Sequence, residues 1–174
     1  MLNYIRKRRL KKAIATNKRK HIFKNFNDIE SVLILFDASH VDVISKIAGY
    51  LKSCGKKVIL WTSATPETNP NNIQSLLIDS CKVIDYEEFS KIKIVKDDLL
   101  DKYAILSYDT LLDLTIENNI ILNYLLAKNS AEFAIGIKES PDKVYDLVYL
   151  KEEKTDLYET FLQLKNYLNN IHNG

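Results

Sequence analysis

The chain has 174 residues, of which 46% are hydrophobic and 28% are charged, as expected for one domain with its own core. Its longest apolar runs fall far short of the ~20 residues that span a bilayer. Its two cysteines, Cys54 and Cys81, match neither a disulfide framework nor a metal-ligand spacing. The composition therefore excludes an integral membrane segment and a disulfide scaffold, and it favours a reducing, cytoplasmic location.

The net charge of +2 conceals two regions of opposite charge. Ten Lys and Arg residues lie among the first 24 positions, and the first acidic residue is Asp28. The remaining 150 residues carry 15 basic and 23 acidic side chains. We therefore expect a basic helical arm over residues 1–27 and an acidic domain over residues 28–174. Because a dense block of like charge favours a polyanionic partner, the arm is the first candidate for a binding function.

Residues 2–18 are good helix formers without Gly or Pro, which predicts a helix. Its basic residues surround the helix axis and leave a narrow apolar stripe of Leu2, Ile5, Leu10 and Ala13. A helix that lies on a membrane needs a wide apolar face, so the pattern favours nucleic acid over the alternative of an anionic membrane surface. The candidate RNA-binding residues are Arg6, Lys7, Arg8, Arg9, Lys11, Lys12, Lys18, Arg19, Lys20 and Lys24.

From residue 31 the sequence alternates short apolar runs with helical segments. Residues 31–37 are typical of a buried strand, residues 41–55 of an amphipathic helix that ends at Gly55, and residues 57–62 of a second strand. Together they predict a βαβ unit with two parallel strands.

The second half of the chain repeats this alternation. Its middle predicts a short helix over 73–78, a weak strand over 82–85, an edge strand over 91–95 and a helix over 96–106. Strands follow over 109–115, 131–137 and 145–150, with helices over 120–130 and 155–171. Two parallel βα halves indicate an α/β fold, a doubly wound, mostly parallel Rossmann-like sheet preceded by the basic N-terminal helix.

Ligands of doubly wound sheets bind beyond the carboxyl ends of the strands, at the point where the strand order reverses. The strands at 31–37 and 109–115 have Asp37 and Asp113 at their carboxyl ends. If these strands are neighbours, the two carboxylates could lie close enough for one to have a raised pKa or for both to hold a divalent cation. In the structural alternative, Asp37 or Ser39 caps the following helix, and Asp113 accepts hydrogen bonds from loop amides. The first strand is followed by none of the glycine motifs that bind dinucleotides or nucleoside triphosphates. We therefore expect no cofactor and no metal.

Two segments resemble the N-terminal domain of heptosyltransferase-type (GT-B) glycosyltransferases. VLILFDASHVDV is similar to that family's strand and acceptor-side loop, with Asp42 at the position of the catalytic base, and the segment from Tyr108 to Ile137 is similar to its later strand, helix and strand ending in Gly136. Val41 stands where that family has Gly, and its second, nucleotide-binding domain has no counterpart here. The chain also resembles an uncharacterised bacterial family of small Rossmann-like proteins with a basic N-terminal arm.

We expect a non-catalytic RNA-binding protein, associated with the ribosome or another structured RNA, whose acidic domain packs on ribosomal or other proteins. The alternative is a small glycosyltransferase-like or metal-dependent enzyme, or a ligand-binding domain, that uses Asp37, Asp42 and Asp113. An enzyme needs these carboxylates to converge in one pocket. A binding module needs only an ordered arm that stands off the domain.

Overall fold

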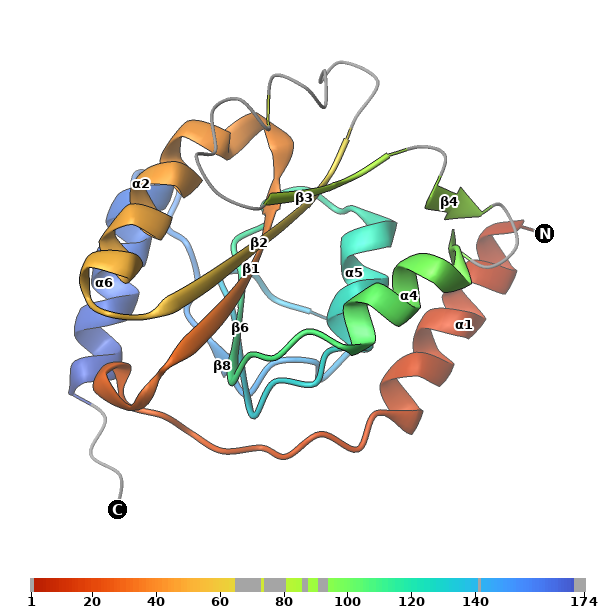
Figure 1. The fold of residues 1–174 in the computed structure, drawn as a ribbon, viewed down its shortest axis with the longest axis horizontal. Helices are drawn as coiled ribbons and strands as arrows, with labels where there is room; N and C mark the ends of the chain where they lie inside the picture. Colours follow the sequence, from red (N-terminus) through yellow and green to blue (C-terminus); the bar gives the residue numbers. More distant parts are fainter. Residues whose placement is uncertain are drawn as a thin grey trace.

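The structure is a computed structural model that describes residues 2–64, 73, 81–85, 88–90, 94–140 and 142–170. Its centre is a six-stranded, all-parallel sheet with the strand order β3-β2-β1-β6-β7-β8 (Figure 1). The strands are β1 (Ser31–Asp37), β2 (Lys57–Ser63), β3 (Cys81–Ile84), β6 (Thr110–Asp113), β7 (Phe133–Gly136) and β8 (Leu147–Val148). Because strand order reverses between β1 and β6, the predicted doubly wound Rossmann-like fold is confirmed.

Helices cover both faces of this sheet. They are α1 (Leu2–Thr16), α2 (Val41–Ser53), α4 (Asp97–Ala104), α5 (Ile120–Ala127) and α6 (Leu157–Asn169). In Figure 1, α2 and α6 lie on one face and α1, α4 and α5 on the other. The fully buried run of β1 supplies both cores, since Ile34 and Phe36 pack towards α2 and α6 while Leu33 and Leu35 pack towards α5.

The first βαβ unit forms as the sequence predicts. α2 is apolar on one side only, and Ile44, Ile47 and Leu51 of that side are buried. Gly55 adopts a left-handed φ of 79°, which lets the chain leave the helix and enter β2. β2 then pairs in parallel with β1, with Ser31 opposite Lys57.

The middle of the chain departs from the prediction in one place. The expected strand over 82–85 is β3, at the edge of the main sheet, and the expected helix over 96–106 is α4. Of the edge strand expected over 91–95, residues 91–93 lie outside the described residues. Ile94–Val95 form β5, which is not at the edge of the main sheet but pairs antiparallel with β4 (Phe89–Ser90) in a separate two-stranded sheet. The helix expected over 73–78 falls largely outside the described residues.

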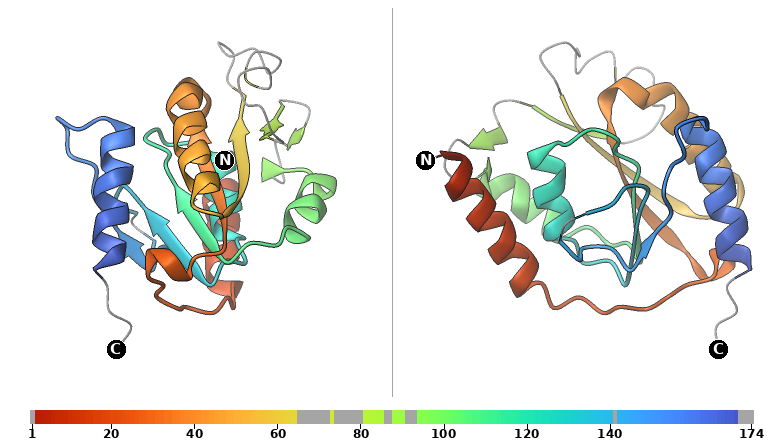
Figure 2. Two further views of the ribbon diagram at one scale, coloured as in Figure 1. Left: turned by 60° about the vertical axis from the view of Figure 1, so that its left-hand side comes forward. Right: turned by 180° about the vertical axis from the view of Figure 1, so that it is seen from behind.

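The arm packs against the domain and does not stand off it. α1 lies beside α5, and the segment that follows it runs along the end of the sheet to β1 (Figure 2). Ala13 is buried in the core, and the partly buried Leu10 and Ile14 pack against that core. The expectation of a free arm is therefore wrong, because the narrow apolar stripe is used for docking.

The end of the arm is fixed to the start of the sheet by a buried lysine. The short 3-10 helix η1 (Phe26–Asp28) precedes β1, and the Lys56 ammonium donates hydrogen bonds of 2.7 Å to the carbonyl oxygens of Phe26 and Ile29. Burial lowers the pKa of Lys56, although nearby Cys54, Asp109 and Asp28 act in the opposite direction. These bonds tie the arm to the strand β2 that begins one residue later.

Candidate functional site

The switch point of the sheet brings Asp37 and Asp113 to the same edge. β1 and β6 are neighbours, with Leu35 opposite Asp113, so Asp37 extends two residues past that pair. Both carboxylates are buried. The sequence prediction depended on these strands being neighbours, and the structure meets that condition. The partners of the two carboxylates decide what they can do.

Asp37 holds the loop that follows β6. Its Oδ2 accepts hydrogen bonds from the backbone N–H groups of Ile116 at 2.6 Å and Glu117 at 3.0 Å. The Nδ1 of His40 lies 3.9 Å from the same oxygen. The 3-10 helix η2 (Ala38–His40) separates β1 from α2. Asp37 forms no side-chain cap of η2, and α2 has His40 at its N-cap without a side-chain cap hydrogen bond, so the expectation that Asp37 or Ser39 caps the following helix is wrong.

Asp113 is engaged on both of its oxygens. Oδ1 accepts from the backbone N–H of Thr115 at 3.0 Å and from its hydroxyl at 2.6 Å, which is the expected bonding to a loop amide. Oδ2 accepts from the Tyr145 hydroxyl at 2.5 Å. Burial and the adjacent carboxylate raise the pKa of Tyr145, so this phenol stays a hydrogen-bond donor.

Two further residues close the switch point, and sequence reasoning missed both. The Lys138 ammonium donates to the Thr115 hydroxyl at 2.6 Å and to the Glu117 carbonyl at 3.0 Å. The Tyr145 ring lies against the backbone of Gly136, where an added Cβ would come within 2.5 Å of a ring atom. The only sequence signal for this contact is the glycine at the end of an apolar strand.

Asp42, the third candidate carboxylate, is exposed in the first turn of α2. Ser39 Oγ lies 3.4 Å from the Nδ1 of the adjacent His40. Within the described residues, no group of three or more His, Cys, Asp and Glu side chains is arranged to hold a metal ion. The buried carboxylates of the switch point thus serve as acceptors that fasten a loop, and this arrangement presents neither of them as a general base.

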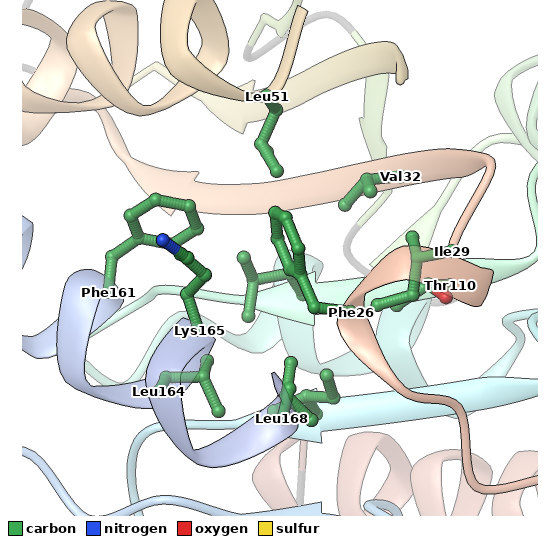
Figure 3. Close-up of a pocket in the computed structure, with 11 residues that line it drawn as sticks. Phe26, Ile29, Val32, Leu51, Thr110, Phe161, Leu164, Lys165 and Leu168 are labelled. Atoms are coloured by element: carbon green, nitrogen blue, oxygen red, sulfur yellow. The ribbon is translucent and has the colours of Figure 1, made fainter. Parts of the chain in front are cut away.

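An apolar pocket lies on the face of the sheet that α2 and α6 cover, between α6, η1 and the strands (Figure 3). Its walls include Phe26, Val32, Leu164 and Leu168, and its volume is about 20 Å³. That is room for about one water molecule, and the lining is almost wholly apolar. We interpret it as a packing void of the core.

Two of the arm's cations are used inside the fold. The Arg19 guanidinium forms a paired contact with Asp146 at 2.7 and 3.0 Å, with both side chains only 5% exposed. Lys24 lies 3.0 Å from Glu132 and 3.7 Å from Asp109. Their charges are neutralised within the protein, so neither side chain is free to bind phosphate as the sequence predicted.

The Asp146 carboxylate is the anchor of the arm. Besides Arg19 it accepts from the backbone N–H of Ala134 at 2.7 Å and lies 2.6 Å from Nδ1 of His21. Burial acts to raise the pKa of Asp146, but these hydrogen bonds and the charge of Arg19 outweigh it and hold the pKa below its ordinary value.

The remaining cations of the arm are exposed or partly buried at its surface. Four exposed residues occupy one side of α1 at helical spacing, and we call them the basic face: Lys7, Arg8, Lys11 and Lys12. Lys18 and Lys20 are also exposed, although Lys20 lies 3.9 Å from Glu132. Arg6 is half-buried above the Phe89 ring, 4.8 Å from its centroid. In the described part of the chain, no acidic side chain forms an ion pair with the basic face.

Two grooves flank the basic face and share Arg9 and Lys12. The first, of about 320 Å³, is lined by Tyr4, Ile5, Arg8, Arg9 and Lys12. The second, of about 360 Å³, lies between α1 and α5 and is lined by Arg9, Lys12, Ala13, Thr16, Tyr124 and Lys128. Sequence reasoning missed the contribution of Lys128, because it lies more than a hundred positions from the arm.

No helix that the structure describes is long and apolar enough to cross a membrane. The chain matches no curated protein and no solved structure. These comparisons give no support to the resemblance to heptosyltransferase-type glycosyltransferases. A family model does match, over residues 3–171, and therefore takes in both the arm and the sheet. The chain accordingly belongs to the family of unknown function DUF6913.

Proposed function

We propose that the protein is a non-catalytic RNA-binding protein whose contact surface is the basic face of α1. The observation that carries this proposal is a set of four exposed cations on one helix side, without an acidic partner among the residues described. Like charges this close repel one another until a polyanion neutralises them. The phosphates of a nucleic acid neutralise such cations, and the release of the counterions condensed on the nucleic acid makes the binding free energy more favourable.

The mode of docking favours RNA over a membrane surface. A helix that binds a bilayer inserts its apolar face between the lipids. The apolar residues of α1, among them Leu10, Ala13 and Ile14, are instead turned towards the domain. The exposed side of α1 carries its cations together with Tyr4, which is 70% exposed, so it has no wide apolar face. Phosphates along a nucleic acid strand fit a surface rich in cations.

The switch point supports a binding role over catalysis. Asp37 and Asp113 are occupied by loop amides, a hydroxyl and a phenol, and Asp42 lies exposed on α2. Acid–base and metal chemistry both need carboxylates that reach a common ligand atom. For this reason we do not propose the enzyme alternative.

We further propose that the RNA is structured, as in the ribosome, and that the acidic domain faces away from it. Beyond the first 24 residues the chain carries eight more acidic than basic side chains, which disfavours contact with phosphate and leaves that surface to protein partners. Copurification with RNA from cells, with and without ribonuclease, and sedimentation with ribosomes test this assignment. A protein that copurifies with no RNA and does not sediment with ribosomes would contradict it.

The binding surface is tested by a variant that removes three lysines, K7Q/K11Q/K12Q. Its matched control, K46Q/K57Q/K154Q, removes three exposed lysines elsewhere on the domain. Affinity for a structured RNA is measured by fluorescence anisotropy over a range of salt concentrations. We expect the arm variant to bind more weakly and its slope of log K against log[salt] to fall by roughly two to three, since each phosphate contact contributes about 0.7 to 0.9.

The control variant should keep most of the affinity and the slope of the native chain. Equal losses in the two variants would show a non-specific charge effect and refute the basic face as the site. Binding to vesicles with anionic lipids, together with no binding to RNA, would refute RNA as the partner.

A further inference from the structure

The groove between α1 and α5 gathers cations from two distant parts of the chain. Arg9 and Lys12 come from the arm, and Lys128 follows the last residue of α5. Figure 2 shows the two helices side by side. No acidic residue lines this groove among the residues that the structure describes. Three positive charges therefore surround a hollow of about 360 Å³.

The two sides of the groove are held in place by the fold. Asn17 follows α1, and its Nδ2 donates to the carbonyl oxygens of Ala127 at 3.0 Å and Asn129 at 2.9 Å. These two residues flank Lys128, so a single side chain of the arm fixes the backbone on both sides of that lysine. The buried Ala13 lies in the groove floor and locks the helix against the core. Binding there needs little ordering of backbone, which lowers its entropic cost.

The chemistry of the lining fits a phosphate group. Besides its three cations the groove is lined by Thr16 and Tyr124, and the Thr16 hydroxyl donates to the Lys12 carbonyl oxygen at 2.8 Å, so the cations are the groups that would bind an anion. Tyr124 is only 8% exposed, so its ring offers no free face on which a base could stack. The groove suits the charged backbone of a nucleic acid, and it carries no group arranged to distinguish one base from another.

We propose that this groove is a phosphate-binding site in which Lys128 of the domain acts together with Arg9 and Lys12 of the arm. The identification of its ligand as an RNA backbone phosphate rests on the proposed function. The adjoining groove at Tyr4 and Arg8 shares Arg9 and Lys12 with it, so neighbouring phosphates of one strand can occupy both. The interface is thus composite, and the arm supplies only part of it.

The variant K128Q tests this inference, and K46Q, which removes an exposed lysine of α2, is its control. In the anisotropy titrations K128Q should lower the slope of log K against log[salt] by roughly 0.7 to 0.9, the loss of one phosphate contact. Inorganic pyrophosphate is the second probe, and its binding is monitored in 1H–15N spectra of the full chain. It should shift the amide signals of Ala13, Thr16 and Lys128 in the native protein and leave them in place in K128Q.

The outcomes separate this inference from the proposed function. RNA binding by K128Q with the native slope and affinity, and no pyrophosphate shift at these amides, would overturn the groove while RNA binding stands. Pyrophosphate shifts in a protein that binds no RNA would support the groove and refute the proposed function. Thermal unfolding at the native temperature is expected for both variants, because Lys128 and Lys46 are exposed.

Discussion

The buried ion pair between Arg19 and Asp146 is expected to determine how firmly the arm is held. Replacing Arg19 by Met keeps much of the side-chain volume but leaves Asp146 buried without its strongest partner. The two guanidinium contacts of 2.7 and 3.0 Å would be lost, while the backbone N–H of Ala134 and the His21 ring would still contact the carboxylate. Removing one member of a buried pair typically costs about 3 to 5 kcal/mol.

This loss should be plain in thermal unfolding. In a chain of this size each kcal/mol lowers the midpoint by about 2 to 4 °C, so R19M should unfold roughly 10 °C below the native protein. The neighbouring Lys20 provides the control, because its side chain is 76% exposed and lies 3.9 Å from Glu132. K20M should change the stability by less than about 1 kcal/mol.

The double variant R19M/D146N separates the pair from its surroundings. It removes both charges, so it should be more stable than the sum of the two single losses predicts. An R19M midpoint within about 2 °C of the native value would refute the reasoning, because it would show that the buried Asp146 does not need the Arg19 guanidinium. The same contacts predict that deletion of residues 1–20, which removes Arg19, destabilises the domain.

Three further predictions concern the anchor and the switch point. Because the pKa of Asp146 in the folded protein lies below the ordinary value of about 3.9, the stability that its carboxylate contributes is present above pH 4 and is lost as the pH falls through the folded pKa. In urea unfolding, the difference in stability between the native protein and D146N should therefore shrink on acidification. A difference that does not depend on pH would contradict this. G136A should destabilise by about 1 to 3 kcal/mol in the same assay, because the new methyl group displaces the Tyr145 ring and weakens its bond to Asp113, and an unchanged stability would show that the ring moves freely. D42A should alter stability by less than about 0.5 kcal/mol and leave the protein's cellular phenotype unchanged, and loss of that phenotype in a folded protein would favour the enzyme alternative.

The regular elements followed from local patterns in the sequence. The apolar run of residues 31–37 and the one-sided apolar spacing of α2 can each be recognised from residues that are close together in the sequence. Both patterns predict elements with apolar faces, and packing a helix on a sheet buries those faces. The adjacency of Asp37 and Asp113 followed in turn, since parallel βα halves place the ends of their first strands together. The antiparallel pairing of β4 with β5 could not be predicted from the sequence, because a two-residue strand is too short for its periodicity to indicate a partner.

The sequence by itself determined that the positive charge is concentrated at the N-terminus and that the rest of the chain is acidic. Only the tertiary structure decided which of these cations remain available. Arg19 meets a carboxylate 127 positions away, and Lys128, at the end of α5 on the same face of the sheet as α1, lies beside the arm although it is more than a hundred positions away in the chain. Such partners depend on how helices pack on a sheet, and a charge carries no local pattern that distinguishes a buried ion pair from an exposed one. A cation becomes structural or functional according to what the fold places within a few ångströms of it.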